Sequence, residues 1–226
     1  MLFTAESLKI QRGTGKNTKL ILDSNCGFTI ETGKLYHLNG VSGVGKSTLL
    51  WVLARLHPML SGVLQFNGVK HTQIAVAQWR AEIALLPQKP VIIQGTVLDN
   101  LYYPLHSFRI QQERHKTLPT IRDLLQELQS VGLQDITLER NAISLSGGQQ
   151  ARLALVRLLL TKPQIILADE PTAGVDSIAA DLVFARILQF CTDGGAVIFT
   201  NHRNSKHITN LEILLNEQGK LKLVTY

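Results

Sequence analysis

The segment that most constrains this fold is the nine-residue run GVSGVGKST at Gly40–Thr48. It matches the pattern G-x-x-x-x-G-K-[ST]. An apolar run, Leu35 to Leu38, precedes it, and a helical stretch is expected to follow from Ser47 to Leu56, ended by Pro58. A strand, a glycine-rich loop and a helix in this order begin a parallel α/β unit. We therefore expect an α/β protein with this loop at the end of a strand.

The same loop predicts a phosphate-binding site. Glycines allow backbone N–H groups to converge on phosphate oxygens, and the start of the following helix adds the favourable end of its dipole. Lys46 is expected to reach the β- and γ-phosphates of a nucleotide, and the Ser47 hydroxyl to take one ligand position of Mg2+. The alternative is a turn that merely tolerates anions. The residues expected to contact the nucleotide are Gly40, Val41, Ser42, Gly43, Val44, Gly45, Lys46, Ser47 and Thr48.

Composition places the chain among globular proteins. Its 226 residues are 45% hydrophobic, and a chain of this length can bury a core, which argues against disorder. The net charge of +6 is small for a dedicated nucleic-acid binder. Cys26 and Cys191 lie far apart, so neither a disulfide framework nor a structural zinc site is expected. No apolar run reaches 18 residues and the first residues lack the pattern of a secretion signal, so a cytoplasmic protein is expected.

Hydrophobic periodicity changes twice along the chain. Apolar runs punctuated by glycine predict short strands over residues 2–38 and again over 61–87. Helical spacing replaces them between about 91 and 160, at Ile121–Val131 and at Gln149–Leu160. This middle region is therefore expected to be mostly helical.

The α/β pattern resumes after Pro163. We expect a buried strand at Ile165–Ala168, a helix at Ser177–Phe190 that starts at Asp176, and a buried strand at Ala196–Thr200. The helical region is then an insertion into one core. This predicts a single domain over 1–226, with an α/β core of about 1–90 and 161–226 and a helical subdomain of about 91–160.

Two adjacent carboxylates end the strand that begins at Ile165. Side chains alternate along a strand, so Asp169 and Glu170 can take different roles. Asp169 suits the magnesium shell, and Glu170 suits a base that polarises a water aimed at the γ-phosphate. Alone, such a pair is more often a helix cap or a solvated turn. Beside a phosphate loop, the catalytic interpretation is favoured.

A second phosphate-binding helix end is predicted at Leu145–Gln149, which reads LSGGQ. Ser146 and Gln149 form a capping box, and the two glycines expose the first backbone N–H groups of the helix. The residues expected to contact nucleotide here are Ser146, Gly147, Gly148 and Gln149.

Together and in this order, Gly40–Thr48, Leu145–Gln149 and Ile165–Glu170 resemble the motifs of the ATP-binding cassette (ABC) transporter ATPases. The resemblance implies a P-loop NTPase fold, with a RecA-like core, an antiparallel β subdomain and an inserted α-helical signature subdomain. It also implies ATP and Mg2+ as cofactors. Gln88 looks like the family's Q-loop glutamine, Asp176 lies in a segment similar to its D-loop, and His202 resembles its switch histidine.

Residue roles follow from this resemblance. Glu170, His202, Lys46 and Gln88 would be catalytic, with Ser47, Gln88 and Asp169 near the metal, and Asp176 near the nucleotide. Outside the family context, Gln88 and His202 would be ordinary loop residues. One departure concerns adenine: no aromatic residue lies between Phe3 and Phe28, where the family has a stacking ring. Arg12 is then the residue expected to stack on the base, although a solvated arginine is equally compatible.

The resemblance also implies partners. In this family the LSGGQ segment of one subunit covers the nucleotide of the other, so two copies would enclose two ATP molecules. A separate transmembrane permease subunit would dock beside Gln88, with the chain peripheral on the cytoplasmic face of the inner (plasma) membrane and no nucleic acid expected. The stretch at Gly95–Asn100 resembles small bacterial export-type subunits. Two alternatives remain at this stage, a soluble cassette acting on nucleic acid or the ribosome and a regulatory cassette without turnover. The transported substrate is not encoded in these motifs.

Overall fold

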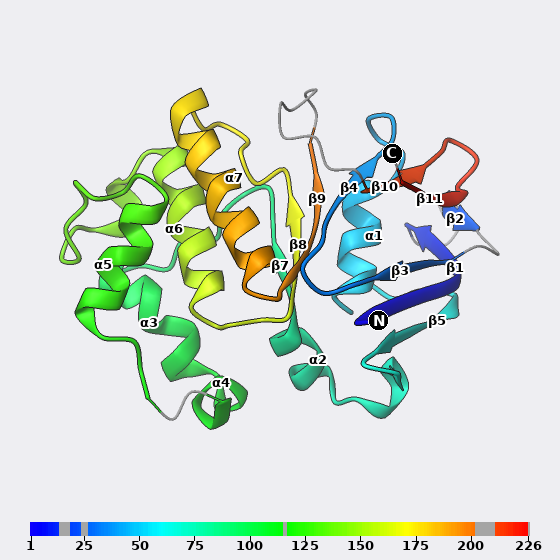
Figure 1. Ribbon diagram of the computed structural model, residues 1–226, viewed down its shortest axis with the longest axis horizontal. Coiled ribbons are helices and arrows are strands. Elements are labelled where there is room, and N and C mark those ends of the chain that lie inside the picture. The colour runs from blue at the N-terminus through cyan, green and yellow to red at the C-terminus, as the bar shows by residue number, and fades with distance from the viewer. Residues whose placement is uncertain (14–18, 24–26, 115–116, 202–210, 226) are drawn as a thin grey trace.

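The computed structural model describes residues 1–13, 19–23, 27–114, 117–201 and 211–225. Figure 1 shows strands through the centre and right of the molecule and a group of helices at the left. The strands form two sheets, one with six strands and one with five. This mixed α/β arrangement agrees with the expected fold class.

The six-stranded sheet has the order β11-β10-β4-β9-β8-β7, and all its pairs are parallel except β10 with β11. Its strands are β4 (Leu35–Asn39), β7 (Ile83–Leu86), β8 (Ile165–Asp169), β9 (Ala196–Thr200), β10 (Leu211–Leu215) and β11 (Leu221–Thr225). Because β4, β9, β8 and β7 are neighbours and parallel, their carboxyl ends meet at one edge of the sheet.

Both faces of this sheet are covered, which explains the uninterrupted apolar runs of β8 and β9. Ile165 and Leu167 belong to the core cluster that includes residues of α1 (Lys46–Leu53), whereas Ile166 and Ala168 belong to the cluster of the opposite face. That second cluster contains side chains of α6 (Gly147–Leu159) and α7 (Ser177–Thr192). Alternation along each strand therefore distributes residues to two cores.

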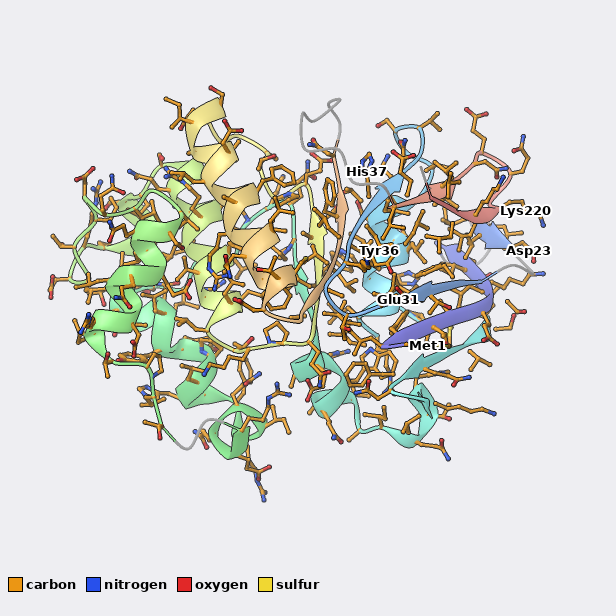
Figure 2. The ribbon with its side chains drawn as sticks, in the orientation of Figure 1. Met1, Asp23, Glu31, Tyr36, His37 and Lys220 are labelled. Atoms are coloured by element: carbon orange, nitrogen blue, oxygen red, sulfur yellow. The ribbon has the colours of Figure 1, made fainter. Side chains whose placement is uncertain are left out.

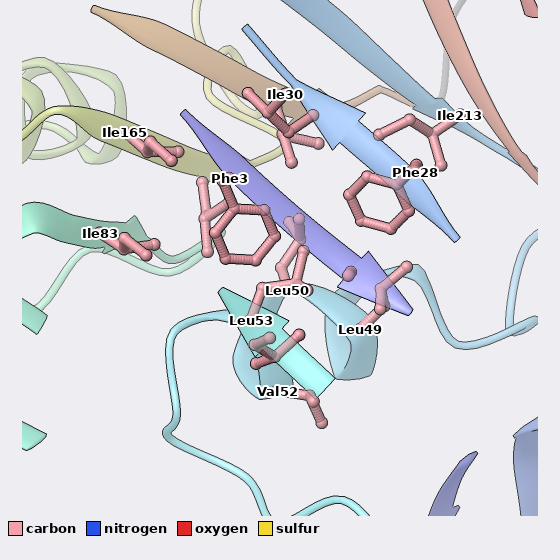
Figure 3. Close-up of a cluster of buried hydrophobic side chains, with 14 of the residues drawn as sticks. Phe3, Phe28, Ile30, Leu49, Leu50, Val52, Leu53, Ile83, Ile165 and Ile213 are labelled. Carbon is pink, nitrogen blue, oxygen red and sulfur yellow. The ribbon is translucent and has the colours of Figure 1, made fainter. Parts of the chain in front are cut away.

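A smaller antiparallel sheet packs on the α1 side. Its strands are β1 (Phe3–Arg12), β2 (Lys19–Asp23), β3 (Phe28–Ile30), β5 (Ser61–Phe66) and β6 (Val69–Lys70), in the order β2-β1-β5-β6 with β3 paired to β1. Figure 3 shows Phe3 of β1 near Leu50 and Leu53 of α1, and Ile165 of the larger sheet in the same cluster. Helix α1 is thus held between the two sheets.

The region 61–87 differs from the expectation of strands alone, because it also contains the helix α2 (Val76–Glu82). Trp79 in this helix is fully buried, and its Nε1 donates to the Leu53 carbonyl at 2.9 Å. The expected end of α1 was also wrong. The helix stops at Leu53 rather than Leu56, because Arg55 takes a left-handed conformation (φ +56°) and donates to the Ile74 carbonyl.

The middle region is helical, as expected. It contains α3 (Val97–Ser107), α4 (Arg109–Arg114), α5 (Ile121–Ser130), a short 3-10 helix at Ala142–Ser144, and α6. The Thr96–Asp99 capping box starts α3. Arg186 of α7 makes a two-point ion pair with Glu127 of α5, with both distances 2.9 Å.

The turn between β10 and β11 contacts the end of β2 in the smaller sheet, at the right of the molecule. Lys220 lies beside Asp23, as Figure 2 shows, and its Nζ donates to the Asp23 carbonyl at 2.7 Å. The Asp23 amide in turn donates to Gly219 O at 3.1 Å. Within the described part of the chain, every helix is too short or too polar to cross a bilayer.

Candidate nucleotide-binding site

The predicted site residues gather at the carboxyl edge of the six-stranded sheet. The glycine-rich loop follows β4, the acidic pair ends β8, Gln88 follows β7, and Thr200 ends β9. In open α/β sheets, ligands bind at this edge, outside the carboxyl ends of the strands. Residues separated by much of the sequence therefore meet because their strands are neighbours.

Close packing shapes the glycine-rich loop. The Asn39 side chain accepts the Gly40 N–H at 2.7 Å, which fixes the exit of the chain from β4. Gly45, the N-cap of α1, has φ +115°, and a Cβ there would lie 2.1 Å from Ile21 Cγ2. Only glycine fits this position, in both conformation and space. No side chain caps the first turn of α1, so its backbone N–H groups are available to an anion.

Lys46 lies over the loop that precedes it. Its Nζ donates to the carbonyls of Gly40 (2.6 Å) and Val41 (3.2 Å). Burial lowers the pKa of the amine, and the negative charges of Glu170 and Asp169 oppose that shift. These two carboxylates therefore favour the charged form of Lys46, the form that a phosphate attracts.

Thr200 connects the two acidic residues. Asp169 is buried, with 5% of its surface exposed, and its Oδ1 accepts the Thr200 hydroxyl at 2.7 Å. The Glu170 amide donates to the same Thr200 oxygen at 3.0 Å. Glu170 has φ +51°, a strained conformation for a residue with a side chain, and such strain concentrates at functional sites. Sequence reasoning missed Thr200, although a hydroxyl at the end of the neighbouring strand was a usable signal.

Gln88 reaches the acidic pair directly. Its Nε2 donates to Glu170 Oε2 at 2.9 Å across a separation of 82 residues. The side chain lies at the surface, whereas Asp169 and Lys46 are buried. The structure therefore brings Gln88, Glu170, Asp169 and Lys46 to one place, with Ser47 exposed at the start of α1.

The LSGGQ segment lies elsewhere. The predicted capping box is present: the Ser146 Oγ accepts from the Gln149 amide (3.3 Å), and the Gln149 side chain accepts from the Ser146 amide (2.9 Å). A Cβ on Gly147 would meet no atom within 4 Å, but one on Gly148 would lie 3.0 Å from the Gly174 carbonyl. In Figure 1, strands of the larger sheet lie between α6 and α1. One chain therefore does not bring its two phosphate-binding helix ends together.

The remaining predicted residues have mixed outcomes. Asp176 caps α7, since its Oδ1 accepts the Ala179 amide at 2.9 Å, and the helix starts where the sequence predicted. Gly174, two residues earlier, packs against Gly148. His202 and the side chain of Arg12 lie outside the described parts of the structure, so their roles stay predictions.

Comparison with known proteins identifies the family. The sequence model of the ABC transporter family matches residues 24–173, two thirds of the chain. The chain belongs to the ABC transporter family. This membership confirms the resemblance read from the motifs, and the family's ATP-binding, ATP-hydrolysing domain agrees with the site described above.

The individual relatives differ in length and in the transport role that their names state. The chain is 35% identical over 184 residues to a lactococcin transport/processing ATP-binding protein of Lactococcus lactis, matching 80% of the chain but only 25% of that protein. It is 34% identical over 172 residues to a phosphonates import ATP-binding protein of Trichormus variabilis, with 75% and 70% coverage. The chain thus spans about a quarter of the length of the first of these ABC proteins.

Solved structures show the same fold. A dimeric ATP-binding cassette in a post-hydrolysis state with ADP and Pi superposes with a TM-score of 0.83 at 23% identity, covering 99% of this chain and 98% of that one. A bacterial Atm1-family ABC exporter with ATP bound gives a TM-score of 0.83 at 19% identity, covering 99% and 39%. The P-loop NTPase fold of ABC ATPases is thereby confirmed.

Proposed function

We propose that this chain is the ATP-hydrolysing subunit of an ABC transporter. The observation that carries the proposal is the meeting of Lys46, Asp169, Glu170 and Gln88 at the carboxyl edge of one parallel sheet, in a chain of this family. In this proposal the chain is a single ATPase domain, whose helical subdomain lies between about residues 91 and 160.

The nucleotide phosphates would lie over the glycine-rich loop. The uncapped N–H groups of α1 and the Lys46 ammonium supply positive charge, and Lys46 would exchange its two carbonyl partners for phosphate oxygens. Mg2+ fits the available donors, since it prefers oxygen ligands. The Ser47 hydroxyl and the Asp169 carboxylate would hold it, with the Gln88 amide oxygen close by. When bound, the ion neutralises charge that develops on the phosphates.

Glu170 is the group that would act on water. Its carboxylate follows the strand that holds Asp169, and the hydrogen bond from Gln88 orients it. Oriented in this way, it would accept a proton from a water in line with the γ-phosphate. His202 would assist on the other side of that water. A carboxylate replaced by an amide cannot accept the proton, so Glu170→Gln is expected to lower kcat by about 100-fold or more while retaining ATP binding.

The LSGGQ segment would act on a second chain. Within one chain it lies apart from the glycine-rich loop, and it presents an exposed Ser146 and the open Cα of Gly147. The Ser146 oxygen accepts the Gln149 amide, which leaves the hydroxyl proton for a γ-phosphate. Two copies arranged head to tail would then enclose two ATP molecules. Asp176, close to Gly148 through Gly174, would lie at the same interface.

Transport requires a membrane-spanning partner. We propose a separate permease subunit that docks beside Gln88 and places the cassette on the cytoplasmic face of the inner membrane. The relatives named for lactococcin transport and phosphonate import support a transport role but differ in direction and substrate. We therefore leave the substrate unassigned.

Mixing two inactive variants tests the arrangement of the two chains. Lys46→Ala inactivates the phosphate loop and Ser146→Arg inactivates the LSGGQ segment. Each variant alone is therefore expected to be inactive. In a mixed dimer, one site combines the intact loop of one chain with the intact segment of the other. Half of the dimers would then carry one working site of two, which recovers up to about a quarter of the wild-type rate.

The control for this experiment mixes two variants that damage the same element. Lys46→Ala with Gly45→Val leaves every site without an intact phosphate loop, so no activity is expected from that mixture. Equal recovery in both mixtures, or none in the first at protein concentrations where ATP-bound dimers form, would count against the head-to-tail arrangement. Size-exclusion chromatography of Glu170→Gln with ATP measures dimer formation separately.

A further inference from the structure

Arg157, near the end of α6, donates hydrogen bonds to two residues outside its own helix. Its Nη1 donates to Asn100 Oδ1 at 3.2 Å, and its Nη2 donates to the Val91 carbonyl. Burial lowers the pKa of the guanidinium, which reflects the cost of removing a cation from water. A long cationic side chain usually keeps its head in solvent. Arg157 is instead partly buried, and its head binds two acceptors of the protein.

Asn100 is the centre of the cluster. It is fully buried in α3, with 0% of its surface exposed. Its Nδ2 donates to the carbonyls of Ile93 (3.1 Å) and Thr96 (3.0 Å), and its Oδ1 accepts from the Ile93 amide (3.0 Å) as well as from Arg157. A carboxamide has two N–H donors and two acceptor lone pairs, so every hydrogen-bonding position of Asn100 is used. The hydrogen bonds of Asn100 therefore hold the backbone from Ile93 to Thr96.

The chain held in this way leads directly to Gln88. Only Lys89 and Pro90 separate Gln88 from Val91, and a proline restricts the backbone between them. Gln88 contacts Glu170 at one end of this segment, and Arg157 holds Val91 at the other. The short segment from Gln88 to Val91 therefore connects Glu170 to α6.

Helix α6 also carries the LSGGQ segment at its other end. Gly147 lies ten residues before Arg157, about 15 Å along a helix that rises 1.5 Å per residue. The side chain of Arg157 is thus a direct mechanical connection between this helix and the segment of Gln88.

We propose that Arg157 and Asn100 are positioning residues that hold Gln88 against Glu170 and tie it to the orientation of α6. The proposal rests on the role of Gln88 in the proposed function. It predicts that Arg157 affects turnover through Gln88, and not merely through stability.

A double-mutant cycle tests this coupling. The ATPase rate of the full chain is measured for wild type, Arg157→Met, Gln88→Ala and the double variant. Losing the charge-assisted hydrogen bonds of Arg157 is expected to lower kcat about tenfold in the wild-type background, with KM little changed. With Gln88 absent, the same substitution is expected to lower kcat less than about twofold, because residues that act as a unit are not additive.

Arg186→Met is the matched control, since Arg186 is also a partly buried arginine that joins helices of the same region. Arg186→Met is expected to lower the melting temperature. Any reduction in kcat that it causes is expected to be the same factor whether residue 88 is Gln or Ala. Hydrogen exchange at the Ile93 amide, which Asn100 accepts, is expected to rise in Arg157→Met and to stay unchanged in Arg186→Met. If the Met variant fails to fold, Arg157→Lys serves in the cycle, because a lysine keeps the charge but cannot bind both acceptors as a fork.

The outcomes separate the two proposals. If Gln88→Ala leaves kcat unchanged, the role of Gln88 in the proposed function fails and the positioning role fails with it. If Gln88→Ala lowers kcat but Arg157→Met lowers it by equal factors in both backgrounds, the proposed function stands and the positioning role is refuted. An Arg157→Met variant with the wild-type rate also refutes it.

Discussion

Thr200→Val removes one oxygen from the site and little volume. The Thr200 hydroxyl donates to Asp169 Oδ1 at 2.7 Å and accepts from the Glu170 amide at 3.0 Å. Valine replaces the hydroxyl with a methyl group, so both hydrogen bonds are lost at once. Because Thr200 is 1% exposed and Asp169 5% exposed, little water is available to replace the hydroxyl.

The magnitude follows from the kinds of bond that are lost. The bond to the Asp169 carboxylate is charge-assisted and contributes about 1.5–3 kcal/mol to stability. The Glu170 amide would remain without this acceptor, at a cost of about 1–3 kcal/mol. Together the two losses amount to about 2.5–6 kcal/mol. At about 2–4 °C per kcal/mol for a chain of this length, the melting temperature is expected to fall by about 5–24 °C.

The same substitution should affect the proposed metal site. Groups that orient a metal ligand typically change metal affinity by about 10–100-fold. Titration of Mg2+ into the ATPase assay is therefore expected to show a higher half-saturating concentration for Thr200→Val. Thr200→Ser is the matched control, because it keeps the oxygen and loses only one methyl group, at a cost of about 1 kcal/mol.

Comparison of the two variants decides the question. Thermal unfolding and the Mg2+ titration are measured on both under identical conditions. A serine variant as unstable as the valine variant would show that packing, and not the hydroxyl, is what matters at this position. A valine variant with wild-type melting temperature and Mg2+ dependence would refute the role assigned to the two hydrogen bonds.

Three further predictions use single sites. Gly148→Ala should have a lower melting temperature than Gly147→Ala, because a Cβ at position 148 would lie 3.0 Å from the Gly174 carbonyl, whereas one at position 147 meets no atom within 4 Å. Equal melting temperatures for the two variants would contradict this contrast. Burial raises the pKa of the Cys191 thiol to about 11, so iodoacetamide at pH 8 should label Cys191 in urea-unfolded protein but not in the folded protein, as peptide mass spectrometry can measure. Burial also lowers the pKa of Lys46, so ATP affinity should decline with rising pH before the ordinary lysine pKa of about 10.4 is reached. Titration of a fluorescent ATP analogue into wild type and Lys46→Arg measures this decline. Parallel declines in the two proteins would speak against it.

Local rules predicted several elements correctly. The capping box at Ser146 starts α6, and Asp176 starts α7 where the sequence placed it. Such caps are short-range hydrogen bonds, so a few consecutive residues contain all the necessary information. The apolar runs of β8 and β9 were predictable for a similar reason, since strands covered on both faces need no polar alternation.

Helix α2 shows where local rules stop. Its seven residues are too few for a helical period to stand out, and its main anchor is one side chain, Trp79. That tryptophan is buried because Leu53 of α1 and aromatic rings of the smaller, antiparallel sheet enclose it, and its indole N–H donates to the Leu53 carbonyl. The partner lies outside the segment, so the sequence around Trp79 does not reveal the helix.

By itself, the sequence determined the chemistry that this protein carries: a phosphate loop with Lys46, a carboxylate pair after a strand, and a capped helix start with two glycines. These depend on residue type and on spacing over a few positions. Tertiary structure alone decided that Gln88 contacts Glu170, that Thr200 joins Asp169 to Glu170, and that Arg157 reaches the Gln88 segment. The physical reason is strand order. Pairing of β7, β8 and β9 sets which loop ends become neighbours, and that pairing is fixed by burial of both sheet faces rather than by any local pattern.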